Sequence, residues 1–390
     1  MYNERREMIN NIFKSRNLSA IIFWRPDELV LMLGYMPLWG LSVLVYTADH
    51  EPVLFVPELE PEDLLPKGIT IKTFPWGAKN CTDPWNILYK EIKKLLLQKH
   101  ILDKPVSFIQ SIGGTAPCRM SGEQPPLPAN FTEQLCEISD AGFKEVGSDL
   151  LRLYQYKTSQ DVEGLKLAHS LAAVGVEVFY QQVKTGISES KLAALIESAV
   201  HERIGQNAIS FARAWPMIQS GRNAANGGKY NTTTGKIILD GEFVLLEMGI
   251  CVNGYWADIS RTAITGEIND TQLNVFETVT HAQQIAIKML MPGIAMNDVD
   301  RASRNYITEA GFGKYFNHAL GHQVGFRYHD PGSCLSPHCI DVLQEGMVLT
   351  VEPGIYGAEL NGGVRIEDNF LITANGCQLL SNYPRGLQGD

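Results

Sequence analysis

The segment GEFVLLEMGICVNGYWADISRT constrains the fold of this 390-residue chain more than any other. Asn253-Gly254 lies between two alternating apolar runs, which is the strongest short-range signal for a β-hairpin with a two-residue turn. Such a turn pairs Gly249 with Asp258, so Glu247 becomes the diagonal neighbour of Asp258 on the same face, about 7–8 Å away. The sequence therefore predicts two carboxylates that are directed at one point from an apolar sheet.

Histidines concentrate in the later segment NHALGHQVGFRYHDP. Three of the nine histidines of the chain, His318, His322 and His329, fall within it. The glycines near His322 would allow the backbone to pass close to a ligand. We therefore treat this segment as a second part of the same candidate site.

Two further acidic residues are expected at strand ends. The segment GMVLTVEPGIY places Glu352 at the end of an apolar strand, directly before Pro353-Gly354. In GGVRIEDNFLIT, a strand predicted near 364–372 places Arg365 and Glu367 on the same face, because side chains alternate along a strand.

Four carboxylates and an imidazole at strand ends have a simple physical interpretation. Buried charges must be paired, protonated or bound to metal. Two divalent cations would balance the charge of Glu247, Asp258, Glu352 and Glu367. Oxygen ligands with one nitrogen suit manganese, iron, cobalt or zinc better than copper. Such a site would lower the pKa of a bridging water and polarise an amide carbonyl.

The order and local sequence of these segments resemble the pita-bread hydrolases, the family of creatinase, Xaa-Pro aminopeptidase, prolidase and methionine aminopeptidase. The resemblance covers roughly 155–385 closely, and 1–145 only in layout. It implies two divalent metal ions. The positions that match the family's metal ligands are Glu247, Asp258, His322, Glu352 and Glu367.

The resemblance also implies catalytic roles. His318 and His329 match histidines that contact substrate or stabilise the tetrahedral intermediate. Glu352 would transfer the proton. Arg365 has two interpretations, a catalytic role or the neutralisation of neighbouring carboxylates.

The sequence departs from the family pattern at two places. Glu247 stands where the family has Asp, so its carboxylate extends one methylene further. Either it chelates a shifted ion, or the second metal site is lost. The family also has a histidine near Gly228, where this chain reads GGKYN, with Lys229 and Tyr230 as neighbours. Either of these two could replace the missing imidazole.

The chain is long enough for two domains. We expect an α/β domain over 1–150 and a catalytic domain over 151–390, which opens with a long helix capped by Thr158 and Asp161. The resemblance implies that the second domain is an α+β pita-bread domain, with a curved, mostly antiparallel sheet and helices on its outer face.

Three functions are compatible with these residues. The first is a metal-dependent hydrolase of C–N bonds, an Xaa-Pro aminopeptidase or dipeptidase. The second is a creatinase-like, metal-independent C–N hydrolase or lyase that acts on a small cationic or zwitterionic substrate. The third is a binding protein without catalytic activity. The retained ligand positions favour the first function, and the missing histidine counts against it.

Composition limits the partners. The net charge of -10 argues against nucleic-acid binding, and no apolar run is long enough to span a membrane. Seven cysteines without a CxxC pair and a charged N-terminus lacking a secretory apolar region indicate a cytoplasmic protein with reduced thiols. We expect a small-molecule or short-peptide substrate and a homodimer.

Overall fold

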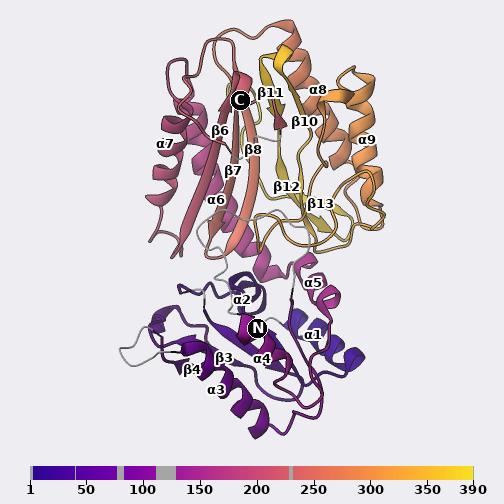
Figure 1. The fold of residues 1–390 in the computed structure, drawn as a ribbon. Helices are drawn as coiled ribbons and strands as arrows, with labels where there is room; N and C mark the ends of the chain where they lie inside the picture. The colour runs from indigo at the N-terminus through magenta and orange to yellow at the C-terminus, as the bar shows by residue number, and fades with distance from the viewer. Residues whose placement is uncertain (1–2, 40, 77–82, 111–128, 228–231, 390) are drawn as a thin grey trace. The chain divides into compact units, whose positions relative to one another are not determined.

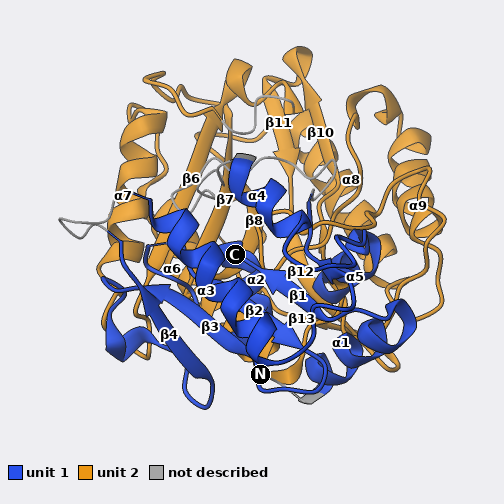
Figure 2. Ribbon diagram, turned by 60° about the horizontal axis from the view of Figure 1, so that its bottom comes forward, with its two compact units in different colours: residues 1–154 blue, residues 155–390 orange. Residues whose placement is uncertain are grey.

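A computed structural model describes residues 3–39, 41–76, 83–110, 129–227 and 232–389. They form two compact units, Met1–Tyr154 and Gln155–Asp390, which Figure 2 colours separately. Within the described ranges, no helix combines the length and the apolar character needed to cross a membrane.

The first unit is built on a mixed five-stranded sheet. Its strands, in spatial order, are β4 (Thr70–Phe74), β3 (Val53–Pro57), β2 (Val43–Thr47), β1 (Ala20–Phe23) and β5 (Val106–Ser107). β1 pairs antiparallel with β2 and parallel with β5. The helices are α1 (Asn3–Arg16), α2 (Pro26–Leu33), α3 (Pro84–Gln98), α4 (Ala129–Cys136) and α5 (Gly147–Gln155). Apolar side chains of the sheet, α3 and α4 share one core, as an α/β unit requires.

The second unit begins with a long helix whose start is encoded locally. In α6 (Ser159–Gln182), the Thr158 hydroxyl accepts the Asp161 N–H, and the Asp161 carboxylate accepts the Thr158 N–H. This reciprocal cap satisfies N–H groups that the helix itself cannot pair. The capping box predicted from the sequence is therefore confirmed.

The first half of this unit is a three-stranded antiparallel sheet covered by two helices. The sheet contains β6 (Ala212–Ser220), β7 (Phe243–Val252) and β8 (Tyr255–Ile264), and α6 and α7 (Glu189–His201) pack against it (Figure 1). Even-numbered residues of β7, from Val244 to Val252, enter the apolar cluster shared with these helices. Its odd-numbered side chains therefore point to the opposite face, where Glu247 lies.

The second half has its own sheets and its own apolar cluster. β13 (Gly376–Leu379), β12 (Asp368–Thr373) and β9 (Val348–Val351) form one sheet, and β10 (Gly354–Gly357) pairs with β11 (Gly362–Arg365). The helices α8 (Asp270–Ile287) and α9 (Met296–Glu309) complete this half (Figure 1). Its core is a second cluster that includes Val279, Val299 and Leu349 and also takes in Phe243 of β7 and Ile264 of β8.

The strand predicted near 364–372 is interrupted. β11 ends at Arg365 and β12 begins at Asp368, and the two strands belong to different sheets. Between them, Glu367 forms an isolated bridge with Ser260 of β8. The prediction of one continuous strand is therefore wrong. After Arg365 the backbone stops pairing with β10, and at Glu367 it pairs with Ser260 of β8 instead. Sequence analysis also did not predict α2, α4, β4, β10 and β13.

Candidate metal centre

The hairpin register brings the first two carboxylates together. β7 and β8 pair Gly249 with Asp258 and Glu247 with Ser260, as the two-residue turn predicted. Asn253 and Gly254 both have positive φ, 50° and 91°, which is the conformation that a type I′ turn requires.

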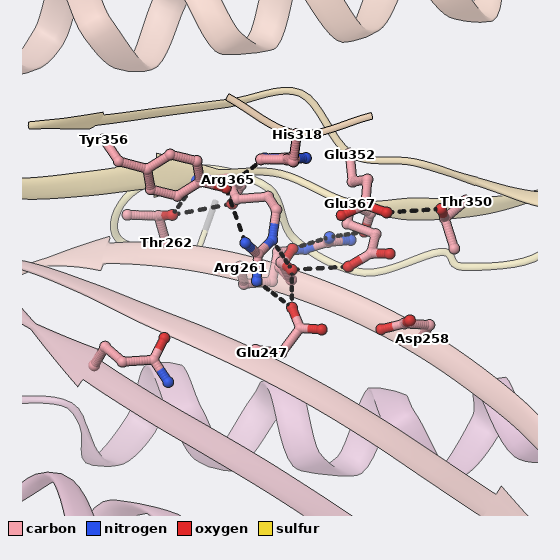
Figure 3. Close-up of polar contacts among 12 residues, drawn as sticks. Glu247, Asp258, Arg261, Thr262, His318, Thr350, Glu352, Tyr356, Arg365 and Glu367 are labelled. Carbon is pink, nitrogen blue, oxygen red and sulfur yellow. Dashed lines mark hydrogen bonds and ion pairs between the residues drawn. The ribbon is translucent and has the colours of Figure 1, made fainter. Parts of the chain in front are cut away.

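The predicted ligand residues gather around one point. Three overlapping groups each place their candidate ligand atoms within 4.8 Å of one another. The groups are Asp258, His322 and His329; His322, Glu352 and Glu367; and Glu247, Asp258 and Glu367. The first hairpin supplies Glu247 and Asp258, and the second half supplies the other members. Figure 3 labels four of these residues, Glu247, Asp258, Glu352 and Glu367. His318 and Arg365 lie outside these groups.

Asp258 and Glu367 have carboxylate oxygens that lack partners. Both oxygens of Asp258 and Oε1 of Glu367 are buried and accept no hydrogen bond from any described residue. Burial, and then the neighbouring carboxylates, raise the pKa of both groups well above the ordinary range. Buried carboxylates without partners must be protonated or must bind a cation. The donor set therefore fits a divalent metal ion.

His322 has the orientation of a metal-binding histidine. Its Nδ1 lies 3.0 Å from the Gln323 carbonyl oxygen, which can only accept, so Nδ1 carries the proton. The unprotonated Nε2 then faces Asp258 Oδ2 at 3.3 Å and Glu352 Oε1 at 3.5 Å. A backbone carbonyl that fixes the tautomer in this way is a common companion of a metal-binding histidine.

Glu352 lies at the accessible side of the cluster. It follows β9 directly, as predicted, and its side chain is 15% exposed, whereas that of Asp258 is 0% exposed. The Thr350 hydroxyl donates to its Oε1 over 3.1 Å. Burial raises the pKa of Glu352, although His322 and Arg365 oppose this shift. A carboxyl group with a raised pKa at an accessible position can accept and return a proton.

Glu247 is bonded very differently from Asp258. Its Oε2 accepts from Arg365 Nη2 at 2.5 Å and from the Ser260 hydroxyl, and its Oε1 accepts from the Tyr328 hydroxyl. Burial alone would raise the pKa of Glu247, but Arg365 and the two hydroxyl donors lower it below the ordinary value. Glu247 is therefore held as a carboxylate by side chains of the protein itself.

Arg365 donates to neighbours within the protein from all three of its nitrogens. Besides Glu247, its Nε donates to Ser260 Oγ at 2.7 Å, and its Nη1 donates to Tyr356 Oη at 2.8 Å (Figure 3). Since Tyr356 accepts from Arg365, its own proton is directed to His318 Nε2, 2.9 Å away. These contacts favour the neutralising interpretation of Arg365 over a catalytic one.

His318 is held in one neutral tautomer. Its Nδ1 donates to the Ala319 carbonyl at 2.8 Å, and its Nε2 accepts from Tyr356. Burial, and then Arg365, lower the pKa of His318 to about 4. Both ring nitrogens are therefore bonded within the chain, which suits a positioning role better than direct substrate contact.

His329 is stacked within the cluster. Its ring lies 3.7 Å from that of His322 and 4.8 Å from that of Tyr328, measured between centroids. Its Nε2 is 3.8 Å from Asp258 Oδ2, and its side chain is 21% exposed. Burial, followed by His322, lowers the pKa of His329 to about 2, so the ring is neutral.

The glycine before His322 serves packing between backbones. A Cβ built on Gly321 would lie 2.1 Å from the Thr350 carbonyl oxygen of β9. Only a residue without a side chain allows this close approach. The expectation that glycines here admit a ligand therefore does not hold for Gly321, which instead brings His322 up against β9.

Four residues of the site were not predicted from the sequence: Ser260, Tyr328, Thr350 and Tyr356. Ser260 had a signal, because it lies two residues after Asp258 and therefore on the same face of β8. Thr350 had the same signal, because it lies two residues before Glu352 and donates to it. Tyr328 and Tyr356 become part of the site only through contacts with residues distant in sequence. Lys229 and Tyr230, which were expected to replace the missing imidazole, and the neighbouring Gly228 lie outside the described residues.

Comparison with known proteins identifies the family. Residues 163–374 match the profile of metallopeptidase family M24. The chain belongs to metallopeptidase family M24. As an M24 member it is a metal-dependent peptide hydrolase, and the pita-bread fold and family predicted from the sequence are confirmed.

M24 relatives match along nearly the whole chain. An Xaa-Pro dipeptidase of Lactobacillus helveticus is 30% identical over 373 residues, which cover 93% of this chain and 92% of that protein. An Xaa-Pro dipeptidase of Pyrococcus horikoshii is 29% identical over 386 residues, 99% of both chains. The crystal structure of the prolidase from Pyrococcus horikoshii OT3 has a TM-score of 0.79 at 27% identity, covering 99% of this chain and 100% of that one.

Proposed function

We propose that this chain is an Xaa-Pro dipeptidase whose divalent metal is held by Asp258, His322, Glu352 and Glu367. The observation that carries the proposal is the set of buried, unpartnered oxygens on Asp258 and Glu367 beside the free Nε2 of His322. The M24 relatives that bear the name Xaa-Pro dipeptidase support the substrate class. Manganese, cobalt, iron and zinc all suit this ligand set.

A bound divalent ion would lower the pKa of a water and polarise the scissile amide carbonyl. The protein's own residues supply the rest. Glu352 would accept the proton of the water and pass it to the leaving nitrogen, for which its place at the accessible side of the cluster is suited. His329 lies at the accessible side as a neutral ring and stabilises the developing oxyanion. His318 and Arg365 position Tyr356, Ser260 and Glu247.

The finer assignments belong to the same proposal. We assign the N-terminal α/β domain to 1–150 and the catalytic domain to 151–390. The substrate is a short peptide, and the protein works as a homodimer in the cytoplasm. Size-exclusion chromatography with light scattering measures the oligomeric state directly, and a monomer would contradict the dimer.

The test compares substrate classes under defined metal conditions. Purified protein is assayed with X-Pro dipeptides, X-Pro-Y tripeptides and creatine-like guanidino compounds, each with manganese and with chelator. We expect manganese-dependent hydrolysis of the dipeptides and little turnover of the tripeptides. Faster turnover of tripeptides would indicate an aminopeptidase. Chelator-insensitive turnover of guanidino compounds would replace the proposal with the creatinase-like alternative.

A further inference from the structure

Two carboxylates on the same hairpin face have opposite bonding states. Both oxygens of Asp258 lack partners, whereas both oxygens of Glu247 accept from side chains, and one of the donors is the cationic guanidinium of Arg365. A carboxylate offers about four lone-pair sites. Arg365 and Tyr328 each donate to one oxygen of Glu247, and the Ser260 hydroxyl has its single proton between Glu247 and Glu367. No described residue donates a hydrogen bond to either oxygen of Asp258.

This contrast divides the cluster into two ends. At one end, Asp258, Glu352 and Glu367 surround His322 Nε2. At the other end, the group of Glu247, Asp258 and Glu367 depends on the carboxylate that Arg365 already holds. A second divalent ion there would have to displace donors from Glu247 and would lie close to a buried positive charge.

We infer that the site holds one divalent ion tightly, at the His322 end, and that Arg365 occupies the place of a second cation by pairing with Glu247. This inference rests on the proposed function, since it assigns the number of ions in the same site. The extra methylene of Glu247 is central to it, because it lets the carboxylate reach Arg365 and Tyr328 at once.

The two hydroxyl donors fix this arrangement. Arg365 Nε donates to Ser260 Oγ at 2.7 Å, so the Ser260 proton is directed to a carboxylate. Its two acceptor neighbours are Glu247 and Glu367. Tyr328 holds the remaining oxygen of Glu247, and its ring packs over Gly249 of the same strand. Glu247 is thus positioned by hydrogen bonds from side chains of the protein.

The experiment measures metal stoichiometry without using activity. The wild type, Glu247→Asp and the control Glu242→Asp are stripped of metal and titrated with manganese by calorimetry, with elemental analysis after dialysis. Glu242 is a matched control because it is also a buried glutamate paired with a cation, Lys236, but it belongs to no ligand group. Electron paramagnetic resonance separates isolated manganese from a coupled pair.

We expect one tight ion per chain and an isolated manganese spectrum in the wild type and in Glu242→Asp. In Glu247→Asp the shorter carboxylate should release Arg365 and Tyr328, so that a second ion binds at least about 10-fold more tightly than in the wild type. Tyr328→Phe, which removes one donor and keeps the volume, should shift the second site in the same direction if Glu247→Asp does not fold.

The outcomes separate the two proposals. Two ions of similar affinity and a coupled spectrum in the wild type would overturn this inference and leave the proposed function intact. One ion in the wild type with no second ion in either Glu247→Asp or Tyr328→Phe would overturn the role given to Glu247. No bound ion in the wild type would overturn the proposed function itself.

Discussion

The ammonium group of Lys157 donates to Asp330 at 2.9 Å, and neither side chain is exposed to solvent. Asp330 also accepts the N–H groups of Phe326 and Arg327. The ion pair therefore joins the segment that carries Tyr328 and His329 to the start of α6, because Lys157 directly precedes the N-cap residue Thr158. The metal centre is held in shape by an ion pair outside it.

Replacing Lys157 by Met should destabilise the protein by about 3–5 kcal/mol, because it leaves Asp330 as a buried carboxylate without its cation. Lys166→Met is the matched control, since Lys166 pairs with Glu163 at 2.7 Å on the surface and should change stability by less than about 1 kcal/mol. Urea unfolding measures both. If the two substitutions lower the free energy of unfolding equally, the buried ion pair stabilises the protein no more than the surface pair does.

Gly321→Ala should be poorly tolerated. The added methyl group would clash with the Thr350 carbonyl and push His322 away from β9, at a cost of about 1–3 kcal/mol or more. Gly235→Ala is the control, because a Cβ at Gly235 would meet nothing within 4 Å. Thermal unfolding compares the two variants. If the Gly321→Ala protein is as stable as the Gly235→Ala protein, Gly321 does not need to lie as close to the Thr350 carbonyl oxygen as the structure has it.

Glu352→Gln should lower kcat by about 10²–10⁴, since an amide cannot accept the proton. Its stability should stay within about 1 kcal/mol of the wild type, because the amide oxygen can still accept from Thr350. Glu345→Gln, at an exposed position, is the control. Because Glu352 is also a proposed ligand, elemental analysis must find the metal retained by the other three ligands before the loss of kcat is assigned to proton transfer. Full activity of this variant would remove Glu352 from proton transfer.

The buried His169 should make stability sensitive to acid. Burial lowers its pKa from the model-peptide value of 6.5 to about 4, so protons bind to it in the unfolded state first. The contribution of neutral His169 to the free energy of unfolding is fully present above pH 6.5. It is lost as the pH falls toward 4, which lowers the free energy of unfolding by about 3 kcal/mol. In His169→Gln this dependence should be absent.

The measurement is urea unfolding of the wild type and His169→Gln between pH 4 and pH 7. The free energy of unfolding of the wild type should rise relative to that of the variant as the pH increases. The other histidines, His318 and His329 among them, are present in both proteins, so their effects cancel. Parallel pH curves would show that His169 does not titrate as its burial indicates.

Local sequence was sufficient to predict part of the site. The two-residue turn fixed the register of β7 and β8, which determined that Glu247 and Asp258 share a face. The apolar run before Glu352 placed that residue at a strand end. In each case the evidence lay within one contiguous segment.

The remaining contacts depend on tertiary structure. Arg365 meets Glu247 across 118 positions of sequence, and Tyr328 meets it across 81. No periodicity in either segment indicates these partners. The break at Glu367 was missed for the same reason, because the residue pairs with Ser260 of the other half and not within its own strand. Alternation along a strand cannot reveal where a backbone changes partner.

The separate apolar clusters of the two halves have a consequence for how the molecule unfolds. Each half packs its helices mainly on its own sheet, although Phe243 and Ile264 of the hairpin also enter the second cluster. The candidate ligands come from both halves: Asp258 from one, His322, Glu352 and Glu367 from the other. An ion at this seam would therefore act as a cross-link between two folding units. Chelation should uncouple them, so that amide hydrogens of β8 and β9 exchange at different rates without metal and at similar rates with it.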